Sequence, residues 1–357
     1  MAYLSQGDAA MCSLVCHGWL YACRERLYSK VYFPTIILPE TSRSFARRQG
    51  LLLGRTLRTS PHLQWFIRYL IVYPRRGHDE VTCTCTCTWI PNVLSLGRVR
   101  HFEAWPCEND ESFQNIISSA PPLPSVKHVS LRGRIKEYRP MSMQRALEMF
   151  PNADSFVLDL RGMRELFPPP TQDHRIIRRI SIIAYDIPAH LFVPYTSSLT
   201  RLDIEAVSTD EKLLAATIIS MTHLVTLTIN IPAKSTFLDH VVPQLPHLRV
   251  LYCAWGAYSS ALLRELPGQI HTLWLQSCWV RGFDVAAINE MTQRSRAHKT
   301  SLRELCLDFR GGDGAQIHSV EASCTASGIH FDYNYSPSDP VVDRMDFSTR
   351  RTSNKQP

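Results

Sequence analysis

The chain has 357 residues, of which 45% are apolar and 20% charged, a balance typical of folded globular proteins and not of disordered ones. This length exceeds what one compact core usually sustains, so the sequence indicates two domains or a repeat architecture that lengthens without enlarging its core. The net charge is +7, and residues 1–80 carry most of the excess, with 11 Lys and Arg against 5 Asp and Glu. A solvated basic face accounts for this excess more simply than an acidic partner or nucleic acid.

The chain contains 11 cysteines without a recurring spacing. They indicate reduced thiols in a cytoplasmic or nuclear protein and not a disulfide framework. Asp8 stands where the basic start of a secretion signal would lie, and no run of about 18 apolar residues predicts a membrane span. We therefore expect no membrane partner.

A helical hairpin is predicted near the N-terminus. Asp8 is a suitable N-cap, and it precedes four apolar residues at helical spacing, Met11, Leu14, Val15 and Trp19. A second short helix is predicted through residues 24–28. Such a hairpin would either pack as a cap on the rest of the chain or offer its apolar residues to a partner, and the sequence leaves both open.

From residue 67 onward, a short unit written apolar-x-x-apolar-x-apolar recurs along the chain. Its clearest copies begin at Leu199, Leu224, Leu248, Ile270 and Leu302, and weaker copies begin at Ile67, Val99, Val126, Ala153 and Ile177. From Val126 onward, six of the seven spacings lie between 22 and 27 residues, within the ~20–29 typical of leucine-rich repeats. Each unit predicts one short strand whose alternate side chains point into the core.

Helices are predicted between these strands. Residues 210–221 place four apolar residues on one face, Leu213, Leu214, Ile218 and Met221, and residues 286–291 form a second example. A final unit runs from Leu302 through a helix near Ile317 to a closing strand at 328–333. The predicted fold class is therefore an α/β leucine-rich-repeat solenoid, with parallel strands on the concave face and helices on the convex face.

The N-terminal residues resemble a known family. The second half of an F-box is similar to two runs of this chain, Cys12-Ser13-Leu14-Val15-Cys16-His17-Gly18-Trp19-Leu20 and Arg26-Leu27-Tyr28-Ser29-Lys30-Val31. Residues 53–70 resemble the helix and first strand that follow the F-box in fungal, basidiomycete-type F-box-like leucine-rich-repeat proteins. This resemblance is specific over residues 8–75 and extends loosely to about residue 335.

The resemblance implies a substrate-recognition subunit of an SCF-type ubiquitin ligase. In that family the F-box docks on a Skp-type adaptor, and through it on a cullin, while the repeats hold a protein substrate. The residues that would contact the adaptor are Met11, Leu14, Val15 and Trp19. The first F-box helix has no counterpart here except Ala2-Tyr3-Leu4, so the alternatives are a misplaced coding start and a freestanding repeat module that has lost adaptor binding.

With this resemblance the chain divides into a partial F-box-like helical segment at 1–33, a linking helix at 34–62, a repeat solenoid at 63–335 and a disordered tail at 336–357. In each strand, residues between the inward-facing ones should line the concave face, where exposed aromatic residues anchor partners efficiently. Trp255, Trp274 and Trp279 lie within or just after late strands. The predicted partner surface comprises Arg201, Asp203, Thr226, Thr228, Arg249, Tyr252, Thr272, Trp274, Glu304 and Asp308.

No pattern in the sequence indicates catalysis, a cofactor or a metal site. Cys83, Cys85 and Cys87 alternate with threonines but lack the paired spacing of a zinc site, so a β-prone surface loop is the simpler interpretation. Trp65 and Tyr69 lie among arginines, as in nucleic-acid-binding proteins. Their alternation with Ile67 instead favours one face of a strand, and no nucleic-acid partner is expected. The sequence predicts a non-catalytic protein-binding receptor.

Overall fold

The computed structural model describes eleven stretches of the chain, residues 17–33, 52–72, 90–104, 122–131, 147–159, 176–231, 235–254, 256–276, 283–297, 300–309 and 314–335. The chain forms two compact units, Met1–Leu224 and Val225–Pro357. Within these stretches, twelve strands follow one another in chain order, β1 to β12. This sequential order is the arrangement expected when each repeat adds one strand beside the previous one.

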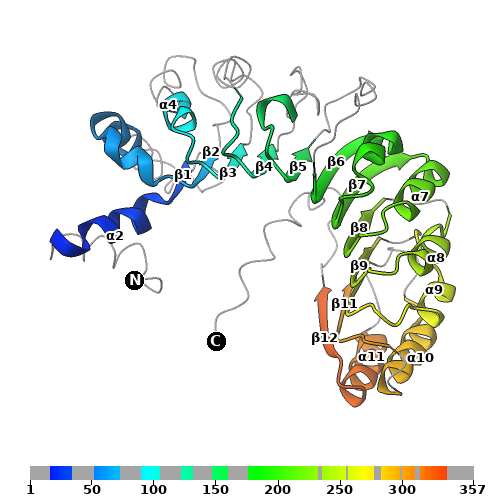
Figure 1. The fold of residues 1–357 in the computed structure, drawn as a ribbon. Helices are drawn as coiled ribbons and strands as arrows, with labels where there is room; N and C mark the ends of the chain where they lie inside the picture. The colour runs from blue at the N-terminus through cyan, green and yellow to red at the C-terminus, as the bar shows by residue number, and fades with distance from the viewer. Residues whose placement is uncertain are drawn as a thin grey trace, which may run out of the picture. The chain divides into compact units, whose positions relative to one another are not determined.

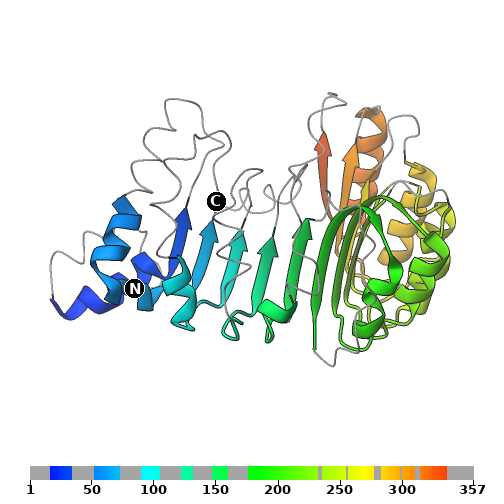
Figure 2. The ribbon, with the colours of Figure 1, turned by 90° about the horizontal axis from the view of Figure 1, so that it is seen from above.

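The first unit contains seven of these strands, and consecutive strands pair in parallel (Figure 2). Their bounds are β1 Lys30–Phe33, β2 Tyr69–Val72, β3 His101–Ala104, β4 His128–Leu131, β5 Ser155–Asp159, β6 Arg179–Ile187 and β7 Arg201–Thr209. Its helices are α2 His17–Tyr28, a helix at 52–59, the 3-10 helix η1 Pro61–Phe66, α4 Ile90–Ser95, a short turn at 147–149, the 3-10 helix η2 Ala189–Tyr195, and α7 Glu211–Ile219.

The second unit contains the remaining five strands, again paired in parallel. They are β8 Thr226–Asn230, β9 Val250–Cys253, β10 Thr272–Gln276, β11 Glu304–Phe309 and β12 His330–Tyr335. Figure 1 shows the helices of this unit gathered on one side of its strands. These helices are α8 Leu238–Val241, the 3-10 helix η3 Val242–Gln244, α9 Ser260–Arg264, α10 Val285–Arg296 and α11 Gly314–Ala326.

The core confirms the repeat pattern. The first apolar residue of every predicted copy is buried, from Ile67 (0% exposed) to Leu302 (4% exposed). The two later apolar positions are buried as well, except for the partly exposed Leu131 in the copy that begins at Val126; in β7, for example, Leu202 and Ile204 are at most 1% exposed. A strand follows each of these starting residues, so the chain is an α/β leucine-rich-repeat solenoid, as the spacing predicted.

Several local details differ from the prediction. Helix α2 runs without a break from His17 to Tyr28, so the boundary expected between Trp19 and residue 24 is absent. Strand β1 was not predicted, because it comes before the first recognisable repeat. Leu213 is 46% exposed, since the buried face of α7 comprises Leu214, Thr217 and Ile218. The predicted tail, residues 336–357, lies outside the described residues, and the predicted segment boundaries at 33/34 and 62/63 remain predictions.

Candidate protein-binding surfaces

Several strands in each unit leave one face of the sheet partly exposed. In β7 the side chains of Leu202, Ile204 and Ala206 are buried, whereas those of Arg201 and Asp203, which alternate with them, are 31% and 14% exposed. Successive side chains of a strand point to opposite faces of a sheet, so residues such as Arg201 and Asp203 share the face that is turned away from the core. We refer to this face as the open face. Residues on it that are paired in register form continuous rows across neighbouring strands.

The second unit presents an aromatic pair on its open face. Thr228, Tyr252, Trp274 and Cys306 stand side by side in register on β8 to β11. The ring centroids of Tyr252 and Trp274 are 5.5 Å apart, with their planes at 52°. Trp274 is half-exposed, and Tyr252 is 8% exposed. The pair therefore offers a mainly apolar centre fixed in place by the strands beneath it.

Polar residues surround this pair. In the adjacent row, Thr272 donates a hydrogen bond from Oγ1 to Oε2 of Glu304, at 3.2 Å. Thr226 and Thr228 are half-exposed, while Glu304 and Arg249 are exposed, the last of these just before β9. An apolar centre within a polar rim is the usual anatomy of a protein interface.

Two members of the predicted surface are buried. Asp308 pairs in register with Gln276, and its side chain is 1% exposed, compared with 8% for Tyr252. The roles of both residues as partner contacts remain predictions. Trp255 and Trp279 lie outside the described residues.

The first unit has a different, charged open face. Asp203 on β7 accepts a hydrogen bond from Nε of Arg201, with the two atoms 2.8 Å apart. Nη2 of Arg179 on β6 lies 3.5 Å from the same Asp203 oxygen. The structure thus brings the predicted pair Arg201 and Asp203 together with a third residue that the sequence did not single out.

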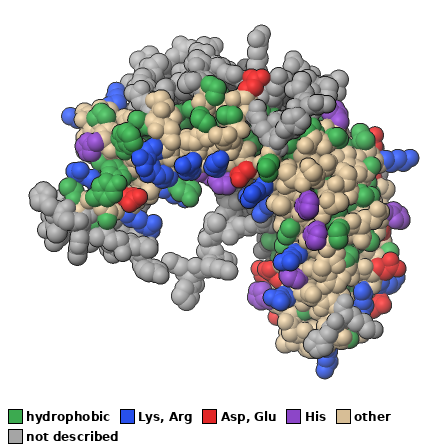
Figure 3. Space-filling model, in the orientation of Figure 1, with side chains coloured by type: hydrophobic (Ala, Val, Ile, Leu, Met, Phe, Trp, Pro, Cys, Tyr) green, Lys and Arg blue, Asp and Glu red, His purple; other side chains and the backbone are tan. Residues whose placement is uncertain are grey.

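A row of cations precedes the earlier strands of this unit. The backbone N–H of Arg100 donates to the carbonyl of Arg68, and that of Lys127 donates to the carbonyl of Arg100, both at 2.8 Å. Arg68, Arg100 and Lys127, which we call the basic row, are therefore neighbours across β2, β3 and β4. Figure 3 shows Lys and Arg side chains following one another along this unit.

A row of rings lies beside the basic row. Tyr69, His101 and His128 pair in register, and we call them the ring row. Ring centroids are 5.6 Å apart between Tyr69 and His101, and 6.0 Å apart between His101 and His128. Glu103 lies 3.8 Å from His101, and Asp154 lies 3.8 Å from His128. Sequence reasoning missed both rows, although aligning the repeats on their first apolar residue would have shown Arg68, Arg100 and Lys127 at one position.

The predicted adaptor-binding residues fall largely outside this description. Met11, Leu14 and Val15 lie outside the described residues, and only the backbone of Trp19 is described, within α2. The same helix places Tyr21 edge-on against Phe66 of η1, with ring centroids 5.0 Å apart, and leaves Tyr21 68% exposed. The adaptor contacts therefore remain a prediction.

The described residues hold no group of three or more His, Cys, Asp or Glu side chains arranged to bind a metal ion. Cys83, Cys85 and Cys87 lie outside them. Burial raises the pKa of Cys324 to about 11 and raises that of Cys253 as well, so both thiols stay protonated and unreactive at neutral pH. No helix in the described stretches has the length and apolar content to cross a bilayer.

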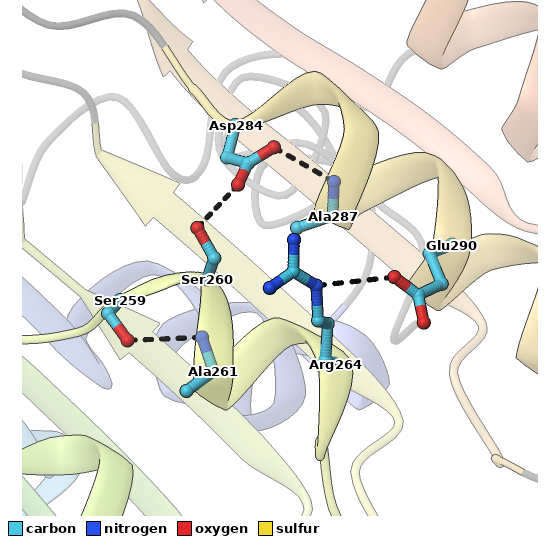
Figure 4. Close-up of polar contacts among 7 residues, drawn as sticks. All are labelled: Ser259, Ser260, Ala261, Arg264, Asp284, Ala287 and Glu290. Atoms are coloured by element: carbon cyan, nitrogen blue, oxygen red, sulfur yellow. Dashed lines mark hydrogen bonds and ion pairs between the residues drawn. The ribbon is translucent and has the colours of Figure 1, made fainter.

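The polar groups on the helical side of the second unit act as helix caps (Figure 4). Asp284 is the N-cap of α10, where its Oδ1 accepts the backbone N–H of Ala287 at 3.0 Å and its Oδ2 accepts the hydroxyl of Ser260. These hydrogen bonds lower the pKa of Asp284. Nε of Arg264 on α9 lies 3.3 Å from Glu290 on α10. The contacts of Ser260 with Asp284 and of Arg264 with Glu290 join one repeat to the next, which indicates a structural role.

Comparison with known proteins adds only distant likeness among solved structures. No family model matches the chain, and no curated protein is similar to it. Among solved structures, the crystal structure of a TLR13–ssRNA13 complex aligns with 74% of this chain at 12% identity and a TM-score of 0.33. The chain spans 37% of the length of that protein. The repeat geometry itself defines the fold class, a leucine-rich-repeat solenoid. Proteins of this fold class are typically non-enzymatic binding scaffolds.

Proposed function

We propose that this protein is a non-catalytic receptor that holds a protein partner on the open faces of its repeats. The observation that carries the proposal is the Tyr252–Trp274 pair, because both rings lie on strands, next to each other, with polar residues around them. Trp and Tyr at the centre of an interface supply much of the binding energy at little cost in side-chain entropy. Trp274 is partly exposed, so a partner on the open face would bury more of its side chain.

We further propose that the N-terminal segment connects this receptor to a Skp-type adaptor, and through it to a cullin, as in an SCF-type ubiquitin ligase. The support for this finer proposal is the F-box-like sequence of residues 12–31. Met11, Leu14, Val15 and Trp19 are the proposed contacts. The alternative is a freestanding leucine-rich-repeat module without an adaptor.

The adaptor proposal is tested by mixing the purified full chain with a purified fungal Skp-type adaptor and measuring complex formation by size-exclusion chromatography. Binding that Leu14→Ala and Trp19→Ala weaken, and that Leu213→Ala on α7 leaves intact, supports the proposal. If the unmodified chain shows no binding, also when extended by any coding sequence upstream of Met1, the freestanding module is the correct alternative.

The partner surface needs an experiment that does not depend on the adaptor. Proteins bound to the tagged full chain in cells are quantified by mass spectrometry for the unmodified protein, Trp274→Ala and Leu213→Ala. Loss of the same proteins with Trp274→Ala alone supports the open face of the second unit as the partner surface. Equal recovery with all three would refute it.

A further inference from the structure

We propose that the basic row of the first unit, Arg68, Arg100 and Lys127, binds an acidic segment of a protein partner through carboxylate side chains. The inference extends the proposed function by giving the chemistry of a second surface, and it needs neither the adaptor nor the Tyr252–Trp274 pair. Three observations support it: the three cationic side chains form no ion pair among the described residues, they repeat at regular positions along the sheet, and hydrogen bonds to backbone carbonyls hold them in place.

Within the described part of the chain, no ion pair joins an acidic side chain to the basic row. There the ion pairs of the first unit join His101 to Glu103, His128 to Asp154, and both Arg179 and Arg201 to Asp203. Arg68, Arg100 and Lys127 have no such partner among these residues. An exposed row of like charges raises the local potential and favours the binding of an anion.

Backbone carbonyls hold the three cationic groups in place. Nη1 of Arg68 donates to the carbonyl of Trp65 at 2.8 Å, and Nη1 of Arg100 donates to the carbonyl of Ser125 at 3.2 Å. Nζ of Lys127 donates to the carbonyl of Asn152, also at 3.2 Å. A carbonyl accepts a hydrogen bond without cancelling the charge, and each guanidinium has five N–H donors. The side chains are thus positioned while most of their donors remain available to a carboxylate.

A fourth cation adds to the same field. Cζ of Arg98 lies 5.1 Å from the ring centroid of Trp65, which leaves its positive charge close to Arg68. Partial burial, together with the charges of Arg98 and Arg100, lowers the pKa of Arg68, and only Glu25 and Tyr21 act in the opposite direction. The unbound protein therefore bears a repulsion that an anionic partner would relieve.

The backbone spacing of the basic row is close to the spacing of side chains on a helix. Neighbouring strands of a sheet lie about 4.8 Å apart, so the backbone positions that carry Arg68, Arg100 and Lys127 repeat at about that interval. Glutamates four residues apart on a helix lie about 5–6 Å apart at Cβ. One face of an acidic helix, or a loop with similar spacing, can therefore pair with successive cations.

Two observations favour a protein segment over a nucleic acid. Asp154 follows Lys127 in the same ladder, where its backbone N–H donates to the Lys127 carbonyl at 3.0 Å. A polynucleotide carries a phosphate at every step and cannot omit one opposite this carboxylate, whereas a peptide can place a neutral residue there. The ring row also leaves no room for a base between its rings, because 5.6 and 6.0 Å are less than about 6.8 Å, twice the ~3.4 Å base rise.

The test uses the full-length chain and three labelled probes in fluorescence anisotropy at low ionic strength, where surface charges are least screened. The first probe is an alanine-based peptide of about 20 residues, long enough to be helical, with Glu at every fourth position. The second has Gln in place of Glu, and the third is a single-stranded oligouridylate of the same net charge as the first. We expect the Glu peptide to bind, the Gln peptide not to bind, and added salt to weaken the complex.

Variants locate the binding. Arg100→Gln with Lys127→Gln should raise the dissociation constant of the Glu peptide about tenfold, while Arg100→Lys, which keeps the charge, should change it less than about twofold. The matched control is Lys212→Gln with Arg296→Gln, which removes the same charge from exposed positions on α7 and α10. Circular dichroism establishes that each variant is folded, and Lys127→Gln alone replaces the double variant if that variant is not.

Three results would overturn the proposal. The first is no binding of the Glu peptide at low salt, and the second is an equal loss with the control pair, which indicates unspecific attraction. The third is tighter binding of the oligouridylate that depends on the same two residues, which assigns the row to nucleic acid. None of these results bears on partner capture by Trp274 or on adaptor binding, so failure of this proposal is distinguishable from failure of the proposed function.

Discussion

Replacing Asp284 by alanine should destabilise the second unit through loss of the cap shown in Figure 4. The change removes the acceptor for the Ala287 N–H, which costs about 0.5–2 kcal/mol for an N-cap. It also removes the acceptor for the Ser260 hydroxyl, which costs about 0.5–1 kcal/mol at an exposed position. We therefore expect a loss of about 1–3 kcal/mol in the free energy of unfolding, with a central value of about 2 kcal/mol.

Glu290 provides a matched control, because it lies on the same helix and also contacts α9. Its ion pair with Arg264 joins two half-exposed side chains, 54% and 52% exposed, and such pairs contribute about 0–1 kcal/mol. Glu290→Ala should thus cost less than Asp284→Ala. Asp284→Asn keeps a good N-cap without the charge, so its cost should fall between the two.

The pH dependence separates the charged cap from simple packing. The folded protein lowers the pKa of Asp284 below its ordinary value of 3.8, so the ionised carboxyl stabilises the fold at pH values above 3.8. This stabilisation is lost as the pH falls from 3.8 through the folded-state pKa. The difference in unfolding free energy between the unmodified chain and Asp284→Ala should accordingly be constant near neutral pH and shrink in acid.

Urea unfolding followed by circular dichroism measures these free energies, and thermal unfolding should show a midpoint lowered by about 3–10 °C for Asp284→Ala. The reasoning would be refuted if Asp284→Ala and Glu290→Ala had equal effects. It would also be refuted if the effect of Asp284→Ala did not diminish at acid pH.

Three further predictions follow from burial and backbone conformation. Leu251→Ala, at a side chain that is 0% exposed, should lower the free energy of unfolding by about 2–5 kcal/mol. Leu213→Ala, at a side chain that is 46% exposed, should lower it by less than about 1 kcal/mol. Equal losses for the two variants in urea unfolding would contradict the burial pattern. Cys324 and Cys253 should resist alkylation by iodoacetamide at pH 8 in the folded protein and react after denaturation, because burial raises the pKa of both thiols. Alkylation of either cysteine in the folded protein, detected by mass spectrometry, would show that the thiols are accessible. Gly328→Ala should cost about 1 kcal/mol, because Gly328, two residues after the end of α11, has φ +68° with nothing near an added Cβ, so only the left-handed backbone opposes the change. Asn tolerates this conformation, so Gly328→Asn should cost less, and equal losses in urea unfolding would point to another cause.

Much of the fold could be predicted because burial in a repeat protein follows a local rule. Each copy of the motif forms its strand against the previous copy, so the same three apolar positions are buried from the copy at Ile67 to the copy at Leu302, with the partly exposed Leu131 as the exception. The helix around Leu213 shows where this rule ends. The sequence placed four apolar residues on one face, but a helix of nine residues buries only a narrow stripe, and Leu213 lies at its edge.

The composition of the candidate surfaces is set more by the register between neighbouring strands than by the sequence of any one strand. Alternation predicted that Tyr252 and Trp274 would face away from the core, yet their contact at 5.5 Å arises from the register between β9 and β10. The same alternation predicted Asp308 as a contact residue, but alternation alone could not show that its side chain is 1% exposed. The basic row went unrecognised because Arg68, Arg100 and Lys127 are separated by tens of residues, and no single repeat contains more than one of them.

The sequence by itself determined the repeating unit, the strands and the inward-facing positions, because these depend on the spacing of apolar residues within one turn of chain. Only the tertiary structure decided which side chains meet across turns. Parallel pairing aligns equivalent positions about 4.8 Å apart, and this converts isolated arginines and aromatic residues into continuous rows. Those rows, and not any motif within one repeat, define the surfaces on which this protein is proposed to hold its partners.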